Sequence, residues 1–386
     1  MTATNPAGAD PAGADPAGTG RATDSQTGSV LRAGVIGLGW AGQQHIDAYA
    51  ADPAVELVAI SGKEQHLLDQ LGDQHDVAGC YPDYTTMLTE EQLDVVSIAT
   101  PTFLHAPMTV QALEAGVNVL CEKPMAETGE AAATMVEAAR RTGKVLDIAF
   151  NHRQRGDVTS LREVVESGVL GEIYYAKTGW LRRKGIPGMG TWFTSAASAG
   201  GGALMDIGVH MLDMSLHLMG EPKVTAVSAS THAQFGPRGR GGSGFGVSSV
   251  VEDMPFEVED LASAFLRMED GGTLLLETSW AQWIPYDQVY VTLYGSEGGA
   301  SVEWGGNPRD PYQRLNVWTE VQGMPAELRP EVGEHGKHAA AVANFLEKVR
   351  TGEPGQHVGL EALRRARILD ACYASAKQGA EVSIDL

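Results

Sequence analysis

A stretch near the start of the chain, Ala33–Gly42 (AGVIGLGWAG), restricts its fold more than any other. Apolar residues lead into the spacing Gly-x-Gly-x-x-Gly, and a helix-like segment follows over 41–51. This is the order of a strand, a tight glycine turn and a helix N-terminus, where unpaired N–H groups attract a pyrophosphate. A tight turn without any ligand could carry the same glycines. The position of this motif between a strand and a helix favours a dinucleotide site. The predicted contacts are Gly37, Leu38, Gly39, Trp40, Ala41 and Gly42.

Strand and helix patterns alternate from this turn to about residue 150. Apolar runs predict strands over 55–60, 94–100, 117–121 and 145–150, with helices over 103–115 and 127–142. Such alternation produces parallel crossovers and a doubly wound sheet, whose ligands bind beyond the carboxyl ends of the strands. The polar residues and prolines at these ends are Thr100, Pro101, Thr102, Glu122, Lys123, Pro124, Asn151 and Arg153.

The end of the second strand, Ser61-Gly62-Lys63, addresses the choice of nucleotide. Sites that prefer NAD carry an acidic residue about 20 residues beyond the glycines, where it binds the ribose 2′-hydroxyl. A hydroxyl and an ammonium stand there instead, and these groups suit a 2′-phosphate. We therefore expect NADP. NAD is the alternative, because a lysine on a turn is often only a solvated surface charge.

Glu122-Lys123-Pro124 follows the fourth predicted strand. A residue before proline is kept out of the helical region, so the backbone of Lys123 is held extended. The pattern predicts a rigidly aimed lysine at the ligand edge of the sheet. A strand-end charge that reaches solvent is the other interpretation.

From Gly171 onward the pattern changes to strands of alternating or mixed polarity, predicted over 173–181, 224–233, 261–268, 273–280 and 288–294. A hairpin turn is expected at Glu269-Asp270-Gly271-Gly272. This indicates an α+β region with a mainly antiparallel sheet. Pro237–Ser249 is glycine-rich and is expected to be a flexible substrate-side or surface loop.

Gly200–Gly220 reads as a helix between a glycine turn and a glycine C-cap. Asp206, His210, Asp213 and His217 recur at spacings that place them on one stripe, with apolar residues on both flanks. Buried polar groups of this kind need partners. Proton transfer by an Asp and His pair is one use of the stripe, metal binding by Asp206 and His210 is another, and a satisfied structural helix is the third.

Composition limits the remaining possibilities. The segment 1–29 repeats AGADP, is expected to be a disordered tail, and has no secretory pattern, so we expect a cytoplasmic protein. A net charge of -21 argues against nucleic acid, and no apolar run suits a membrane span. Cys80, Cys121 and Cys372 lack metal-ligand spacing and are expected to be structural thiols, so no metal is predicted.

Three motifs in this order, GVIGLGWAG, CEKPMA and GGALMDIGVHMLD, resemble those of the Gfo/Idh/MocA oxidoreductases. The resemblance covers about residues 31–385. It implies a Rossmann domain over 30–150 and an α+β domain with a large open sheet over 151–386, whose terminal helices return to the first domain. It also implies homodimers or homotetramers, and it places Thr100, Thr102 and His105 along the cofactor.

The resemblance further implies that Lys123, Asp206 and His210 form the catalytic set. We expect hydride transfer between the nicotinamide and a secondary carbinol or ketone of a sugar, cyclitol or related polyol. His210 would move the proton, Lys123 would stabilise the charge on oxygen and Asp206 would orient the pair. Arg153, Trp180 and Trp192 are candidates for the substrate wall, although Trp192 could be plain core. The alternatives are a lyase or glycosidase that recycles its hydride and a non-catalytic sensor.

Overall fold

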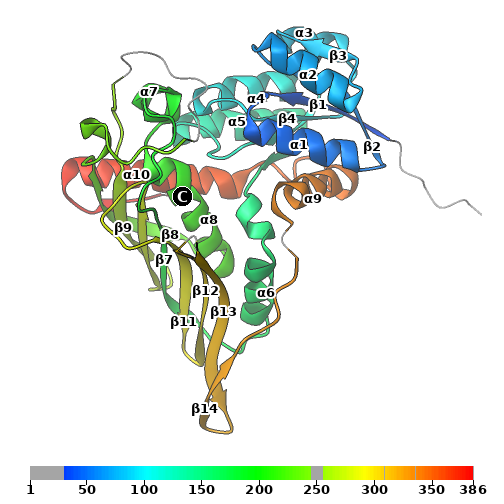
Figure 1. Cartoon of the computed structure of the whole chain (residues 1–386). Coiled ribbons are helices and arrows are strands. Elements are labelled where there is room, and N and C mark those ends of the chain that lie inside the picture. Colours follow the sequence, from blue (N-terminus) through cyan, green and yellow to red (C-terminus); the bar gives the residue numbers. More distant parts are fainter. Residues whose placement is uncertain (1–29, 245–254, 308, 335, 386) are drawn as a thin grey trace, which may run out of the picture.

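The computed structural model describes residues 30–244, 255–307, 309–334 and 336–385. Figure 1 shows two sheets, one at the upper right and a larger one at the lower left, with helices packed between and around them. The predicted tail, 1–29, lies outside the described residues.

The first sheet contains β1 (Leu31–Ile36), β2 (Val55–Ser61), β3 (Gly79–Tyr81), β4 (Val95–Ile98), β5 (Asn118–Cys121) and β6 (Leu146–Ile148). Its order is β3-β2-β1-β4-β5-β6 and every pair is parallel. The connecting helices are α1 (Trp40–Ala51), α2 (Gln65–His75), α3 (Tyr84–Glu90), α4 (His105–Glu114) and α5 (Gly129–Thr142). The predicted doubly wound sheet is confirmed. The order reverses at β1, and ligands bind at such a switch point.

The second sheet has the order β14-β13-β12-β11-β7-β10-β9-β8-β15. Its strands are β7 (Ile173–Leu181), β8 (Val224–His232), β9 (Leu261–Met268), β10 (Thr273–Ser279), β11 (Asp287–Gly295), β12 (Gly298–Asn307), β13 (Asp310–Val321), β14 (Met324–Leu328) and β15 (Val382–Ser383). β7 and β10 pair in parallel, and the other neighbours are antiparallel. A mainly antiparallel sheet was predicted and is confirmed.

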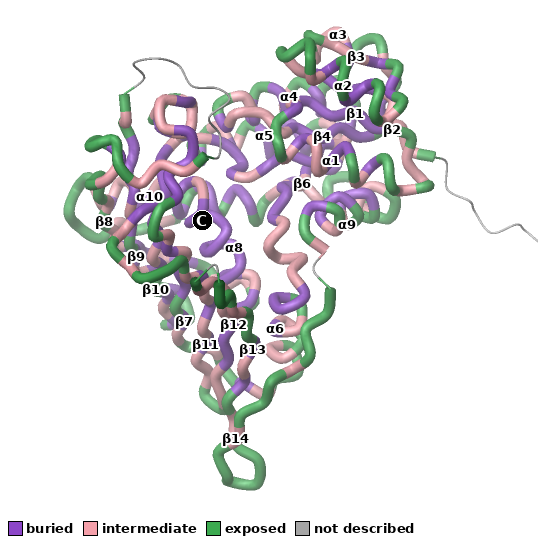
Figure 2. The backbone as a smooth tube through the Cα atoms, in the orientation of Figure 1, coloured by how far each residue is buried: buried purple, intermediate pink, exposed green. Residues whose placement is uncertain are grey.

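The remaining helical segments are η1 (Thr102–Leu104), η2 (Asn151–Gln154), α6 (Gly156–Glu166), η3 (Trp192–Thr194), α7 (Ala196–Ala199), η4 (Leu204–Gly208), α8 (Val209–Leu218), η5 (Gly236–Arg238), α9 (Lys337–Thr351) and α10 (Leu360–Gln378). η4 is a π-helical turn that runs directly into α8. Figure 2 colours α8 as buried over most of its length. Turns of this kind occur often at functional sites.

The last two helices connect the sheets. Val342, Phe345 and Leu346 of α9 are buried in one cluster with Ala33 and Val35 of β1. α10 packs against α5 of the first layer and β8 of the second. No helix among the described residues is both long and apolar enough to cross a membrane.

Candidate active site

The glycine turn has the shape that a dinucleotide requires. Gly37 adopts φ +97°, which L side chains rarely adopt, and a Cβ on Gly42 would lie 1.9 Å from the carbonyl oxygen of Gly37. Gly39 is the N-cap of α1, and a Cβ there would meet no protein atom within 4 Å. The backbone therefore leaves a space at a helix N-terminus that a pyrophosphate fits. Of its neighbours, Leu38 is buried, Ala41 is half-buried and Trp40 is 58% exposed.

The three residues predicted for the ribose lie against this turn. The N–H of Gly37 donates to the carbonyl of Ser61 at 2.8 Å. A Cβ on Gly62 would meet the Leu38 side chain at 2.7 Å. Ser61 is buried, whereas Lys63 is exposed and its charge helps to lower the pKa of Asp83, after the Thr85 hydrogen bonds. The ammonium thus lies near a carboxylate as well as near the predicted ribose position.

His105 joins two of the strand-end segments. One ring nitrogen lies 2.8 Å from the carbonyl oxygen of Pro124 and the other lies 2.9 Å from that of Thr100. Burial lowers the pKa of His105, so the ring is neutral near pH 7. Its side chain lies between the backbone after β4 and the Lys123-Pro124 segment. A neutral ring has one N–H, so it donates to one of these two carbonyls. Thr102 is buried next to it, and Pro101 is the N-cap of η1.

Lys123 and Asp206, from opposite halves of the chain, meet directly. The ammonium of Lys123 donates to Asp206 Oδ1 at 2.9 Å and to its backbone carbonyl at 3.1 Å. The indole N–H of Trp280, the residue after β10, donates to Asp206 Oδ2 at 2.9 Å. Burial opposes ionisation of Asp206, but the charges of Lys123 and Arg182 and these hydrogen bonds lower its pKa. The carboxylate is therefore ionised and fixed through both oxygens.

His210 lies one turn further along the same helix and is buried to 5% exposure. Its ring is 4.4 Å from that of His152 and 6.0 Å from that of Trp180, measured between centroids. Burial and the neighbouring charges of His152, Lys123, His338 and Arg182 lower the pKa of His210 well below its ordinary value. The imidazole is thus neutral near pH 7 and has a free lone pair. The structure brings Lys123, Asp206, His210 and Trp180 together.

Glu122 points into the first domain rather than toward this cluster. Its Oε1 lies 3.0 Å from Nε2 of His45 and 3.6 Å from Nε2 of His338. Burial alone would raise its pKa, but the hydrogen bond and charge of His45, with the charges of His338 and Lys123, lower it to about 2. Glu122 therefore ties the segment before Lys123 to α1 and α9. Sequence reasoning placed Glu122 along the cofactor and gave it no such partner.

The start of the helix that carries Asp206 and His210 is anchored by Glu259, which sequence reasoning missed. Its two carboxylate oxygens accept the N–H groups of Gly202 at 2.9 Å and Leu204 at 2.8 Å. The hydroxyl of Tyr373, from α10, donates to Oε1 at 2.9 Å. A Cβ at Gly201 would lie 1.9 Å from the Tyr373 hydroxyl, which explains part of the glycine run. In the sequence, Glu259 is recognisable only as an acidic residue just before β9, and no motif marks it as an anchor for the helix.

Arg153 and Trp192, both predicted for the substrate wall, have protein partners of their own. Arg153 donates to both carboxylate oxygens of Asp213, at 2.7 and 2.6 Å, and to Glu361 at 2.8 Å. Asp213 also accepts from Arg365 at 3.1 Å. The predicted polar stripe therefore divides, because Asp213 faces this buried ion cluster while Asp206 and His210 face the site. Trp192 stacks on Phe193 in η3, with ring centroids 3.9 Å apart.

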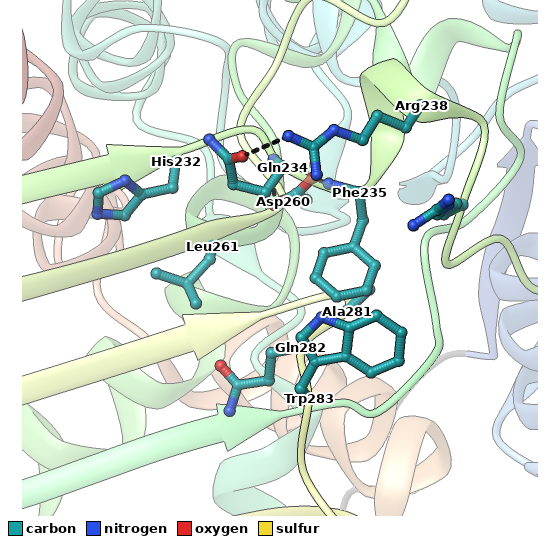
Figure 3. A pocket seen from close by; sticks show the side chains of 10 residues that line it. His232, Gln234, Phe235, Arg238, Asp260, Leu261, Ala281, Gln282 and Trp283 are labelled. Atoms are coloured by element: carbon teal, nitrogen blue, oxygen red, sulfur yellow. Dashed lines mark hydrogen bonds between the residues drawn. The ribbon is translucent and has the colours of Figure 1, made fainter.

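A separate cavity of about 370 Å³ lies where β8 and β10 end. Figure 3 shows Phe235 and Trp283 side by side in it and Arg238 bonded to Gln234. Asp260 accepts the N–H groups of residues 234, 235 and 236 and holds this loop. None of the three predicted catalytic residues lines the cavity. The loop predicted over Pro237–Ser249 is described to residue 244, and the rest lies outside the described residues.

Over the described ranges, no group of three or more His, Cys, Asp or Glu has an arrangement that would hold a metal ion. The site instead combines a neutral histidine, a paired lysine and an ionised aspartate beside a dinucleotide-shaped turn. These features define a nicotinamide-nucleotide-dependent oxidoreductase. Sequence comparison agrees, because residues 31–150 match the oxidoreductase family with an NAD-binding Rossmann fold and residues 158–301 match the Gfo/Idh/MocA C-terminal domain. The chain belongs to the Gfo/Idh/MocA family.

Two curated relatives match over most of both chains. The D-glucoside 3-dehydrogenase of Escherichia coli (strain K12) is 34% identical, over 93% of this chain and 99% of its own. A putative UDP-kanosamine synthase oxidoreductase subunit of Amycolatopsis mediterranei (strain S699) is 32% identical, over 90% and 96%. A structure of levoglucosan dehydrogenase in complex with NADH has the same fold, with a TM-score of 0.78 and 23% identity, over 92% of this chain and 99% of that one.

Proposed function

We propose that this protein oxidises a secondary carbinol of a sugar or glycoside, and reduces the corresponding ketone in reverse, with Lys123, Asp206 and His210 as its catalytic residues. The observation that carries the proposal is the contact of 2.9 Å between Lys123 Nζ and Asp206 Oδ1. It joins the ligand edge of the first sheet to the helix that carries His210. The relatives named for D-glucoside and levoglucosan oxidation support a carbohydrate substrate.

In this proposal His210 takes the hydroxyl proton at Nε2, because its Nδ1 is enclosed. The low pKa of His210 keeps the ring neutral and ready to accept. Such a ring is a weak base, so the proton leaves only if the developing negative charge on oxygen is stabilised at the same time. The Lys123 ammonium supplies that stabilisation, and Asp206 holds the ammonium in place. General acid–base assistance of this kind is typically worth about 10²–10⁴ in rate.

The nicotinamide nucleotide, when bound, accepts or returns the hydride. The residues that would hold it are those of the glycine turn, Gly37–Gly42, and of the ribose turn, Ser61–Lys63. We propose NADP as the preferred form, because the turn Ser61-Gly62-Lys63 at the end of β2 contains no carboxylate, and its hydroxyl and ammonium suit a 2′-phosphate. In this scheme residues 30–150 serve as the nucleotide domain and residues 151–386 as the substrate domain.

We also propose that the protein is a homodimer or homotetramer that associates through the uncovered face of the second sheet. Alternation along the strands puts Phe265, Leu275, Tyr290 and Trp318 on one face of it, opposite α8. Leu275 and Trp318 are each 40% exposed, so this face offers apolar side chains that a second copy of the chain would cover. Light scattering coupled to size-exclusion chromatography tests this: a monomer at micromolar concentration would contradict it.

The experiment that tests the activity is the reduction of NADP and of NAD by the purified protein, followed by absorbance. The panel contains methyl glucosides, free aldoses, anhydrosugars and inositols. We expect reduction with at least one pyranoside. If nucleotide copurifies with the protein and no panel member reduces it, net oxidation of these sugars is contradicted. Consumption of a glycoside without net reduction of the nucleotide would indicate a hydride that is recycled internally.

A further inference from the structure

His152 is a second histidine at the candidate site, and no motif in the sequence singles it out. It lies in η2, directly after the last strand of the first sheet, and its ring is 4.4 Å from the His210 ring. Trp180 of β7 is 5.2 Å from His152 in a T-shaped contact, and Trp304 of β12 is 6.2 Å away and nearly parallel to it. Four elements distant in sequence therefore converge on one aromatic cluster.

The two imidazoles share an unusual feature. In each of them Nδ1 is buried, and among the described residues it has no hydrogen-bond partner. The protein therefore does not fix the tautomer of either ring through Nδ1, and Nε2 is the nitrogen left for a ligand. A buried polar ring is costly unless something satisfies it. Two adjacent imidazoles in this state indicate a ligand that offers two neighbouring polar groups.

The charges around the cluster restrict which ligand groups fit. Burial and the charges of Arg155, Lys123 and His338 lower the pKa of His152 to about 3. His210 is neutral for similar reasons. The Nε2 of a neutral imidazole either donates an N–H or accepts through its lone pair, depending on the tautomer, and a hydroxyl can serve as partner in both cases. Paired hydroxyls match two such rings better than a carboxylate or a phosphate would.

His152 is also held firmly. Arg155 lies over the Trp304 ring at 3.8 Å, and its guanidinium donates to both oxygens of Asp157, at 2.9 and 2.7 Å. Asp157 is itself fully buried. Trp304 is thus fixed beneath His152, which gives the imidazole a defined orientation beside His210. A preorganised polar group of this kind discriminates strongly against a ligand that lacks its partner.

We propose that His152 binds the hydroxyl on the carbon next to the reacting carbinol, so that the substrate is a vicinal diol and the histidine pair decides which carbinol is oxidised. The proposal rests on the proposed function, in which His210 handles the reacting hydroxyl. Hydroxyls on adjacent ring carbons lie close enough for neighbouring rings to bond one each. Trp180 and Trp304 then form apolar walls for the sugar ring.

The test is calorimetric binding of methyl D-glucopyranoside and its 2-, 3-, 4- and 6-deoxy derivatives to the full chain saturated with reduced nicotinamide nucleotide. In the wild type we expect two deoxy derivatives on adjacent carbons to bind roughly tenfold or more weakly than the parent. In His152→Phe the parent should weaken by a similar factor. Removal of one of those two hydroxyls should then no longer change the affinity, while removal of the other still weakens binding because His210 is intact. His152→Gln should recover part of the selectivity.

His232→Phe is the matched control, because His232 is exposed and lines the separate cavity. It should leave the whole series unchanged. An equal loss for every sugar in His152→Phe would mean that His152 only supports the fold, and unchanged binding would mean that it does not contact the sugar. Absence of measurable binding by the whole series at millimolar concentration would also overturn the proposal. Since binding needs no turnover, selective binding without nucleotide reduction would refute the proposed function, and only the contact between His152 and a sugar hydroxyl would remain of this inference.

Discussion

The Arg153 guanidinium donates to both carboxylate oxygens of Asp213, at 2.7 and 2.6 Å, although the two residues are 60 positions apart in the chain. This pair fixes η2, which follows the first sheet, to α8, which lies on the second. His152 and His210 stand on the same two elements. The ion pair therefore sets the spacing of the two imidazoles without touching the site.

Arg153→Ala should lower the free energy of unfolding by about 3–5 kcal/mol, because it leaves Asp213 ionised in a buried position with one partner fewer. Chemical denaturation measures this loss. Arg329→Ala is the control, since Arg329 is 76% exposed and pairs with Glu327 on the surface. Its effect should stay within about 0.5 kcal/mol. Equal losses of unfolding free energy in the two variants would show that the buried ion cluster contributes no more to stability than a surface ion pair.

Two glycines of the nucleotide turn should respond differently to alanine. Gly39→Ala should leave the melting temperature unchanged, because a Cβ there meets no protein atom within 4 Å. It should weaken nucleotide binding tenfold or more, because the methyl group would occupy the pyrophosphate space. Gly42→Ala should lower the melting temperature as well, since its Cβ would lie 1.9 Å from a carbonyl oxygen. Fluorescence titration and calorimetry separate the effects, and tight binding by Gly39→Ala would refute the assigned position.

Lys123→Met and His210→Asn should each lower kcat by at least about 10², the lower limit for lost acid–base or charge stabilisation. The nucleotide dissociation constant should stay within a few fold of the wild type, because the glycine turn is untouched. Stopped-flow measurement of hydride transfer reports on the chemical step directly. Full activity in either variant removes that residue from the mechanism.

Arg182→Gln should move the acid limb of kcat/KM to higher pH. The Arg182 charge helps to lower the pKa of both His210 and Asp206. Activity needs a neutral imidazole and an ionised carboxylate, so it falls as pH drops through these values. Raising either pKa therefore moves the fall upward. Arg183→Gln is the control, because the Arg183 side chain bonds the carbonyl of Ile284 and its charge is not among those that lower either pKa. A shift of the same size in the control would exclude a specific effect.

Ser61→Asp should shift the preference of the enzyme toward NAD. A carboxylate at the end of β2 would repel a 2′-phosphate and accept a hydrogen bond from a 2′-hydroxyl. The ratio of kcat/KM for NADP to that for NAD measures the shift. A wild type that already prefers NAD strongly would contradict the NADP assignment, and Asp83, close to Lys63, would then supply the explanation.

The sequence predicted the parallel sheet well, because buried parallel strands are continuous apolar runs with helices between them. It missed β3, which has three residues, and the four strands β12 to β15 of the second sheet. The sequence of β12, GGASVEWGGN, has too few apolar residues to be recognised as a strand. Sequence reasoning predicted the glycine turn before the helix that carries Asp206 and His210, but it missed Glu259, which anchors that turn. Local pattern has no access to such long-range anchors.

The candidate site divides in the same way. Lys123, Asp206 and His210 belong to motifs, and the sequence was enough to single them out as candidates, which the fold brings close together. Trp280 and His152 were missed, because neither has a local pattern and only the folded sheets bring them to the site. For Arg153 the sequence predicted a contact that the fold does not require. A cation after a strand was expected to bind a ligand, whereas in the structure its partner is Asp213.

The contact between Lys123 and Asp206 joins the first and second halves of the chain at the candidate site. The turns that would select the nucleotide belong to the first half, and most of the walls that would recognise the sugar, Trp180, Trp304 and His210, belong to the second. A natural or engineered change of nucleotide preference therefore need not alter the specificity for the carbohydrate. Such an architecture lets one scaffold acquire new substrates while it keeps its supply of electrons.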